Sequence, residues 1–127
     1  MSKFTGAFVV AGLAVSALAG GAAQAQDAAA GKKVFMRCIA CHAVQPTAGP
    51  KMGPNLAGVV GRKSGSAAGF KYSAAMQKAK LTWNEATLDK WLTKPSTLVP
   101  GTSMAFPGLP NPADRANVIA YLKKPVP

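Results

Sequence analysis

Beyond residue 25 the chain shows no convincing alternation of apolar and polar positions, so the sequence predicts no strand. The apolar residues instead fall into short segments that begin at helix-capping residues. Asp27, followed by three alanines, starts a helix that runs to about Arg37, with Val34 and Phe35 on its buried side. This first predicted helix carries Cys38 at its end.

Two further helices are predicted in the middle of the chain. Ser73 can cap a short helix over residues 74–80. Thr82 and Glu85 form a capping box that opens a helix over residues 83–93, which the proline at position 95 then ends.

The last predicted helix begins with Asn111 as its N-cap and Pro112 at its first position, and it runs to about Lys124. Its apolar face carries three residues: Val118, Ile119 and Leu122. With no strand and several short helices, the pattern predicts an all-α fold.

Two stretches rich in proline and glycine, residues 43–72 and 95–110, are predicted as long ordered loops. Loops of this length are uncommon unless they wrap around something. A domain of this size buries only about 65% of its unfolded surface, which is marginal without a disulfide, a metal or a cofactor. We therefore expect something besides side chains to fill part of the core.

The N-terminal segment has the pattern of a secretory signal. Lys3 precedes an apolar stretch over residues 4–18, and Ala23-Gln24-Ala25 resembles a small-residue cleavage site. An uncleaved membrane anchor is the alternative, since the apolar segment approaches the length that spans a bilayer. The alanine- and glycine-rich composition favours cleavage, so we expect residues 1–25 to be a signal peptide and residues 26–127 to form one periplasmic domain.

The chain is strongly basic, with 15 Lys and Arg against four Asp and Glu and a formal net charge of +11. Removal of the signal would take away only Lys3 among the charged residues. Such a charge steers encounters with acidic partners. Nucleic acid is the general alternative for a basic chain, but the export signal argues against it. The chain has one histidine and four acidic residues, so it offers few residues from which a hydrolytic triad could be built. Any chemistry is therefore expected to come from a cofactor.

Residues 38–42 read Cys-Ile-Ala-Cys-His, the C-x-x-C-H pattern of covalent haem attachment. Two thiols on one helical turn can each add to a haem vinyl group, and His42 can then bind the iron. Cys38 and Cys41 could instead form a thiol–disulfide redox pair, but that motif normally lies in a βαβ setting. A zinc site would need further ligands, and the chain has no other cysteine or histidine.

A haem iron that shuttles electrons needs a second axial ligand, and methionine is the natural candidate here. Met36 and Met76 lie in predicted helices and are expected to pack in the core. Met52 is expected at the haem edge or in packing. Met104 lies in a glycine-bearing loop far from His42 in sequence, so it can cross the opposite haem face and is the predicted distal ligand.

Several motifs in order give the chain a resemblance to the class I c-type cytochromes, in the branch of mitochondrial cytochrome c and its alphaproteobacterial relatives. The resemblance covers nearly all of residues 27–124. It rests on Cys38–His42, Gly53–Leu56, Gly61–Gly65, Tyr72–Ala75, Trp83, Pro100–Met104 and Ile119–Lys124.

The resemblance implies a cytochrome c fold, with about four to five short helices and long loops wrapped around one covalently attached haem c. In that fold the Pro54 carbonyl would accept a hydrogen bond from His42. Arg62, Tyr72 and Trp83 would hold a buried haem propionate. From the residues alone, ordinary core burial is the alternative for Trp83, and Arg62 reads as a solvated loop charge.

The resemblance also implies a contact between the first and last helices through Gly31, Phe35, Tyr121 and Leu122. The chain departs from the family at Trp91, where a tyrosine is common, and at Met76, where an asparagine is common. Ser96 and Ser103 replace lysines beside the methionine loop. The docking surface is therefore expected to rely on three other basic residues: Arg37, Lys51 and Lys94.

The function implied is that of a monomeric periplasmic carrier of one electron, which transforms no substrate. Its expected donor is a quinol:cytochrome c reductase, and its acceptor a terminal oxidase, a photosynthetic reaction centre or another periplasmic redox enzyme. Acidic docking surfaces of these membrane complexes are the expected partners, with only transient association with the membrane surface. If Met104 did not bind, a five-coordinate haem peroxidase or small-molecule binder would be the alternative.

Overall fold

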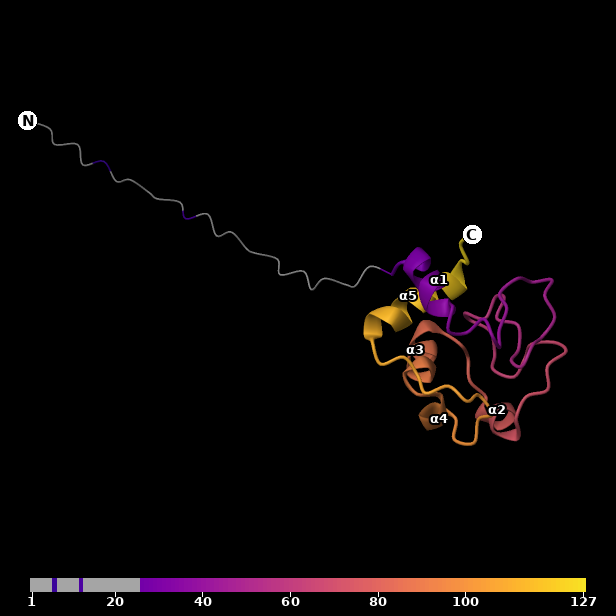
Figure 1. Cartoon of the computed structure of the whole chain (residues 1–127). Coiled ribbons are helices and arrows are strands. Elements are labelled where there is room, and N and C mark those ends of the chain that lie inside the picture. Colours follow the sequence, from indigo (N-terminus) through magenta and orange to yellow (C-terminus); the bar gives the residue numbers. More distant parts are fainter. Residues whose placement is uncertain (1–5, 7–11, 13–25) are drawn as a thin grey trace, which may run out of the picture.

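The computed structural model describes residues 6, 12 and 26–127, and the predicted signal peptide otherwise lies outside the described residues. The described part is all-α, as predicted, with an isolated antiparallel bridge between Lys63 and Thr82 and no strand. None of its helices is long and apolar enough to cross a membrane. The helices, shown in Figure 1, are α1 (Ala28–Phe35), α2 (Ala74–Ala79), α3 (Glu85–Thr93), α4 (Pro95–Leu98) and α5 (Pro112–Lys123).

The start of α1 follows the prediction and its end does not. The Asp27 side chain accepts hydrogen bonds from the backbone N–H groups of Ala29 and Ala30, at 2.9 and 3.2 Å. The helix ends at Phe35, not near Arg37, because the chain tightens into turns there. The N–H of Cys38 bonds to the carbonyl of Phe35, three residues back, at 2.7 Å.

The predicted capping box of α3 is wrong. The N-cap is Asn84, whose side chain accepts from the N–H of Thr87 at 2.8 Å, and the helix begins at Glu85. Thr82 lies two residues before this cap, where it pairs with Lys63 in the isolated bridge. Trp83 therefore precedes the helix and does not belong to it.

The short helices α2 and α4 differ in detail from the predictions. Ser73 caps α2 as expected, but the helix stops at Ala79 because Lys80 adopts the left-handed conformation, with φ at 52°. The loop predicted after residue 95 begins with α4, which Pro95 opens as the first helical residue. A proline at this position both ends α3 and starts the next turn of helix.

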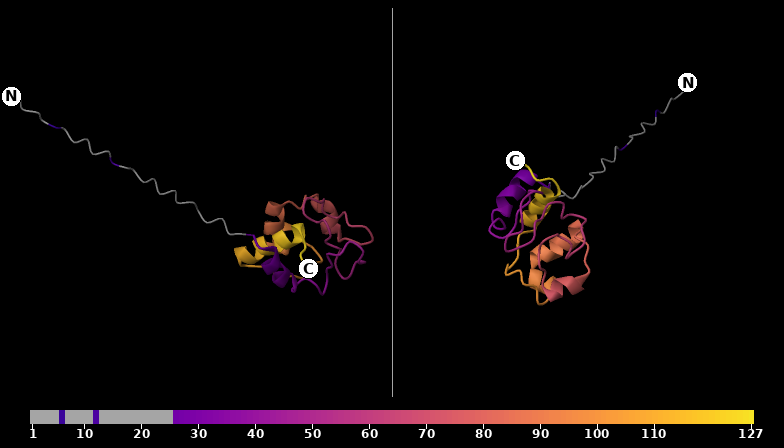
Figure 2. Two further views of the ribbon diagram at one scale, coloured as in Figure 1. Left: turned by 90° about the horizontal axis from the view of Figure 1, so that it is seen from above. Right: turned by 90° about the vertical axis from the view of Figure 1, so that its right-hand side faces the viewer.

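The first and last helices pack directly on each other, and α3 packs on α5 and α4 (Figure 2). Gly31 is buried at the α1–α5 contact, where a Cβ atom would collide with the carbonyl of Asn117. The rings of Phe35 and Tyr121 lie 5.2 Å apart between centroids. The predicted helix contact is confirmed, and Leu122 is buried in the same cluster.

Three methionines differ in how far their side chains are exposed to solvent. Met76 is buried in the core, as predicted. Met36, predicted to be buried, is 61% exposed, because the shortened α1 ends before it can turn this side chain inward. Met52 is 82% exposed, so it contributes little to packing.

Candidate haem-binding site

The Cys-x-x-Cys-His segment folds into two tight turns directly after α1. The backbone N–H groups of Cys41 and His42 both donate to the carbonyl of Cys38, at 3.1 and 2.9 Å. This local winding places the two thiols and the imidazole on one short stretch of coiled backbone. Burial raises the pKa of the Cys38 thiol above its ordinary value, with nearby Arg37 opposing the shift.

The His42 ring is fixed by a backbone carbonyl. Its Nδ1 lies 2.8 Å from the carbonyl oxygen of Pro54. Because a carbonyl can only accept, Nδ1 carries the proton and Nε2 presents its lone pair. Burial lowers the pKa of the imidazole, which favours the neutral ring that binds metals, although the bond to Pro54 partly opposes this.

Gly53 allows the ring to sit where it does, and the sequence prediction did not name it as a site residue. A Cβ at this position would lie 2.5 Å from Cε1 and 2.8 Å from Nδ1 of His42, closer than such atoms approach. The N–H of Gly53 also donates to the carbonyl of Cys41 at 2.8 Å. The Gly-Pro pair at residues 53–54 was the available sequence signal, since it combines a close approach with a fixed turn.

Arg62 is built into the loop and is not a solvated charge. Its Nη1 donates to the carbonyl of Ala57 at 2.9 Å and its Nη2 to the carbonyl of Asn55 at 3.0 Å. Its Nε is buried and has no hydrogen-bond partner among the described residues. A buried, charged N–H without an acceptor is costly, so this atom is suited to a carboxylate brought by a ligand.

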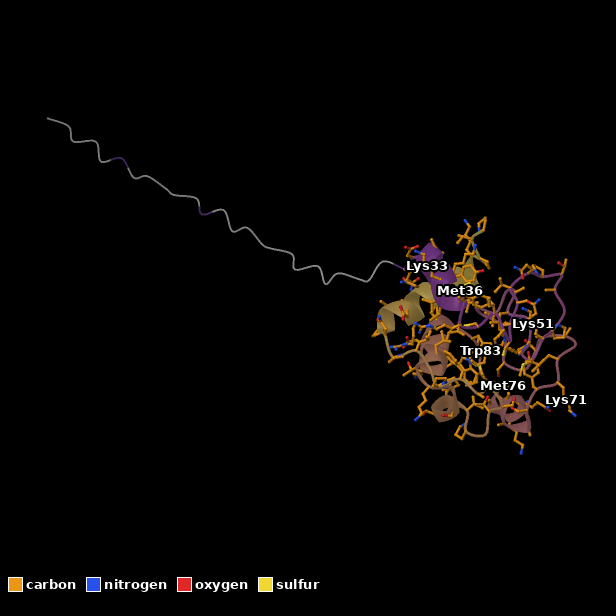
Figure 3. The ribbon with its side chains drawn as sticks, in the orientation of Figure 1. Lys33, Met36, Lys51, Lys71, Met76 and Trp83 are labelled. Carbon is orange, nitrogen blue, oxygen red and sulfur yellow. The ribbon has the colours of Figure 1, made fainter. Side chains whose placement is uncertain are left out.

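Backbone pairing brings Trp83 to Arg62. The N–H of Trp83 donates to the Arg62 carbonyl at 2.8 Å, and the N–H of Gly61 donates to the Trp83 carbonyl at 2.7 Å. Trp83 is 8% exposed and lies against Trp91, with ring centroids 5.3 Å apart. Figure 3 shows Trp83 and Met76 in the interior of the molecule, whereas Lys71 lies at its periphery.

Tyr72 reaches back over the loop that precedes it. Its hydroxyl accepts a hydrogen bond from the N–H of Ala67 at 2.9 Å, which leaves the hydroxyl proton free to donate elsewhere. The Tyr72 ring is half-buried and meets Phe70 edge-on, with centroids 4.9 Å apart. Tyr72 is therefore oriented by the protein while its donor remains available.

Met104 lies in the loop after α4, where its N–H donates to the Thr102 hydroxyl at 3.3 Å. No hydrogen bond within residues 26–127 joins this loop to the His42 motif. Cys38, Tyr72 and Met104 nevertheless all lie partly buried at the edge of the same hydrophobic core cluster. Side chains from distant parts of the sequence thus border one apolar interior.

These residues form a donor set that fits a haem. Two thiols suit covalent attachment, a neutral imidazole with a free Nε2 suits iron, and the unpartnered Arg62 Nε suits a propionate. A family profile described as Cytochrome c matches residues 28–124. The chain belongs to the cytochrome c family. As a member, it carries one covalently bound haem c at Cys38 and Cys41, and it is an electron carrier.

Named relatives agree with this membership. The chain is 53% identical over 100 residues to cytochrome c2 of Rhodoblastus acidophilus, covering 79% of this chain and 94% of that protein. It is 50% identical over 99 residues to cytochrome c of Gossypium barbadense, covering 77% and 89%. The solved structure of cytochrome cH from Methylobacterium extorquens is similar, with a TM-score of 0.73 and 48% identity over 76% of this chain and 97% of that chain.

Proposed function

We propose that this chain is a periplasmic one-electron carrier whose haem iron is bound by His42 and Met104. The observation that carries the proposal is the His42 ring, held with Nδ1 on the Pro54 carbonyl and Nε2 free, on the same turns as the two cysteines. When bound, the haem supplies an iron that gains and loses one electron. Two protein ligands would leave that iron no open position, which suits electron transfer without substrate chemistry.

Each neighbouring residue has a supporting role in this proposal. The Pro54 carbonyl fixes the orientation of His42 and increases the basicity of its Nε2. Arg62 would donate through Nε to a propionate, while its other nitrogens stay on the loop carbonyls. Tyr72 and Trp83 would add two neutral donors. Together they offset the cost of burying a carboxylate.

The proposed route runs from a quinol:cytochrome c reductase to a terminal oxidase, a photosynthetic reaction centre or another periplasmic redox enzyme. The net charge of +11 supports brief encounters of a monomer with acidic docking surfaces, because charge raises association rates more than affinity. Export would follow cleavage of residues 1–25. The intact mass of protein recovered from a periplasmic fraction tests this, and a mass that includes residues 1–25 would contradict it.

Replacement of Met104 tests the axial ligands. In Met104→Ala holoprotein, we expect loss of the weak far-red band of ferric iron bound to sulfur, a lower reduction potential, and binding of added imidazole or cyanide at neutral pH. Met52→Ala is the matched control, because Met52 is 82% exposed, and it should leave all three properties unchanged. An unchanged band and potential in Met104→Ala would remove Met104 as the ligand. Open coordination in the unaltered protein would instead favour a peroxidase or a ligand-binding protein.

A further inference from the structure

One of the two ion pairs among the described residues reaches beyond the helices that carry it. Arg115 on α5 donates through Nε to a carboxylate oxygen of Asp89 on α3, at 2.7 Å. Its Nη1 also donates to the carbonyls of Leu109 and Pro110, at 2.8 and 3.1 Å. The Arg115 side chain is only 12% exposed, so these donors are largely shielded from water. We call Asp89 and Arg115 the loop clamp, because one guanidinium joins α3 and α5 to the chain between them.

The loop clamp holds the exit of the Met104 loop, which we define as residues 99–110. Beside the clamp, the N–H of Leu109 donates to the carbonyl of Leu92 at 2.7 Å, and the Leu109 side chain is fully buried. Gly108 lies so close to α3 that a Cβ atom there would collide with the carbonyl of Thr93. The exit of the loop is therefore fixed against the end of α3.

Between its two ends, the Met104 loop makes only internal hydrogen bonds. The N–H of Thr102 donates to the carbonyl of Val99, and the N–H of Phe106 to the carbonyl of Met104, both at 3.0 Å. Among the described residues, no hydrogen bond joins residues 100–107 to a segment outside the loop. Apart from apolar packing on the core, the position of Met104 therefore depends on how the two ends of the loop are held.

The two ends are held by different means. At the entry, the N–H of Val99 donates to the carbonyl of Pro95 at 3.0 Å, and the Val99 side chain is buried. At the exit, a charged side chain is added to the backbone bonds. The carboxylate of Asp89 binds Nε of Arg115, and this charge-assisted bond orients the planar guanidinium so that Nη1 meets the loop carbonyls. A change at Asp89 therefore reaches the loop through Arg115.

We infer that the loop clamp positions Met104 toward the iron, so that Asp89 and Arg115 keep the methionine ligand bound although neither is a ligand. This inference rests on the proposed function, in which Met104 is the second axial ligand. Without the clamp, the exit of the loop can move, and a larger fraction of molecules has Met104 away from the iron. An added ligand binds only to that fraction, so its apparent affinity measures the fraction.

Asp89→Asn tests the loop clamp in ferric holoprotein, with imidazole as the added ligand. The amide has nearly the shape of the carboxylate but no charge, and the Asp89 side chain is 49% exposed, so the core is not disturbed. We expect the apparent affinity for imidazole at neutral pH, and the binding rate at saturating imidazole, to rise about fivefold. The matched control is Glu85→Gln, which breaks the other ion pair between α3 and α5 but no bond to the loop.

Arg115→Lys should have a larger effect of the same kind, because an ammonium cannot replace the fork that bonds the carboxylate and the loop together. Guanidinium titration gives a second measurement. In both clamp variants, the far-red band of ferric iron bound to sulfur should disappear at a lower guanidinium concentration than the far-ultraviolet circular dichroism of the helices. In Glu85→Gln, the separation between these two transitions should match that of the unaltered protein.

Two results would overturn the inference. One is an equal affinity for imidazole in Asp89→Asn and Glu85→Gln, whether unchanged or raised, because the bonds to the loop would then have no effect of their own. The other is a parallel shift of the far-red band and the circular dichroism in Arg115→Lys, which would make the clamp purely structural. Failure of the proposed function looks different, since the unaltered ferric holoprotein would then lack the far-red band and bind imidazole as strongly as Met104→Ala.

Discussion

The helical part of the molecule, built from α1, α3 and α5, and the loop part, residues 43–82, are stabilised in different ways. The helical part is held by apolar packing, with Gly31, Phe35 and Tyr121 at the α1–α5 contact. Both ion pairs of the described residues also belong to it. Figure 1 shows these three helices close together.

The loop part relies on side chains that bond to backbone carbonyls. Asn55 donates from one nitrogen to the carbonyls of Gln45 and Ala48, both at 2.8 Å, and Arg62 bonds to two more. The backbone of its only helix, α2, does not approach another helix of residues 26–127, although Met76 joins the shared core cluster. Polar bonds of this kind fix the loop geometry but bury little apolar surface, so we expect this part to depend on the cofactor for stability.

Removal of the haem should have the largest effect on stability, and the loop part should be affected most. A Cys38→Ala, Cys41→Ala chain made without haem loses the group that fills the interior, so we expect no cooperative unfolding transition. Circular dichroism during heating, with the holoprotein as control, measures this. A sharp melting transition of the haem-free chain would show that the side chains alone are sufficient.

Gly31→Ala should be the most damaging single change in the helical part. The added methyl group meets the Asn117 carbonyl and forces α1 away from α5, at a cost of about 3 kcal/mol in the free energy of unfolding. Guanidinium denaturation of the holoprotein measures the loss. Gly49→Ala is the control, because no atom lies within 4 Å of a Cβ there, and a similar loss in both would contradict the packing argument.

Arg62→Gln tests the polar scaffold of the loop part. It removes two charged hydrogen bonds to carbonyls, so we expect a loss of about 2 kcal/mol in stability. Arg62→Lys should recover little, since one ammonium cannot replace the planar fork. The exposed neighbour Lys63 provides the control Lys63→Gln. If all three variants denature alike, Arg62 is a solvated charge after all.

Lys123→Gln should have the smallest effect. Its 2.9 Å pair with Glu85 is about half exposed on both sides, and such pairs contribute less than about 1 kcal/mol. We expect a shift below about 0.5 kcal/mol that disappears at high salt. A larger, salt-independent loss in denaturation would mean that the helical part depends on ion pairs as well as packing.

Sequence predictions that depend on neighbouring residues were correct, whereas a prediction at a position that pairs with a distant residue was wrong. Asp27, Ser73 and Asn111 were correctly identified as caps because a cap bonds to groups two or three residues away. Thr82 was wrongly predicted as a cap because its partner, Lys63, lies far away in the sequence. The short helix α4 was missed because its opening proline also ends α3.

For the candidate site, the attachment motif could be predicted from the residues, and the bond of His42 to the Pro54 carbonyl from the family resemblance, but the surroundings of Arg62 could not be predicted from the residues. The spacing of Cys38, Cys41 and His42 is enough to predict the attachment chemistry, because one coiled segment carries all three side chains. From residue type and position alone, Arg62 looked like a solvated charge. Its bonds to Ala57 and Asn55, and its buried Nε, depend on how the loop returns on itself.

The sequence by itself determined the all-α class, the N-caps of α1, α2 and α5, and the haem-attaching motif, because periodicity, capping and motif spacing act over a few residues. Only the tertiary structure decided which methionines are exposed, that Gly53 admits the His42 ring, and that Trp83 lies beside Arg62. These features depend on contacts between segments distant in the chain. Such contacts form only when the loops close around the interior, and no local pattern specifies where they meet.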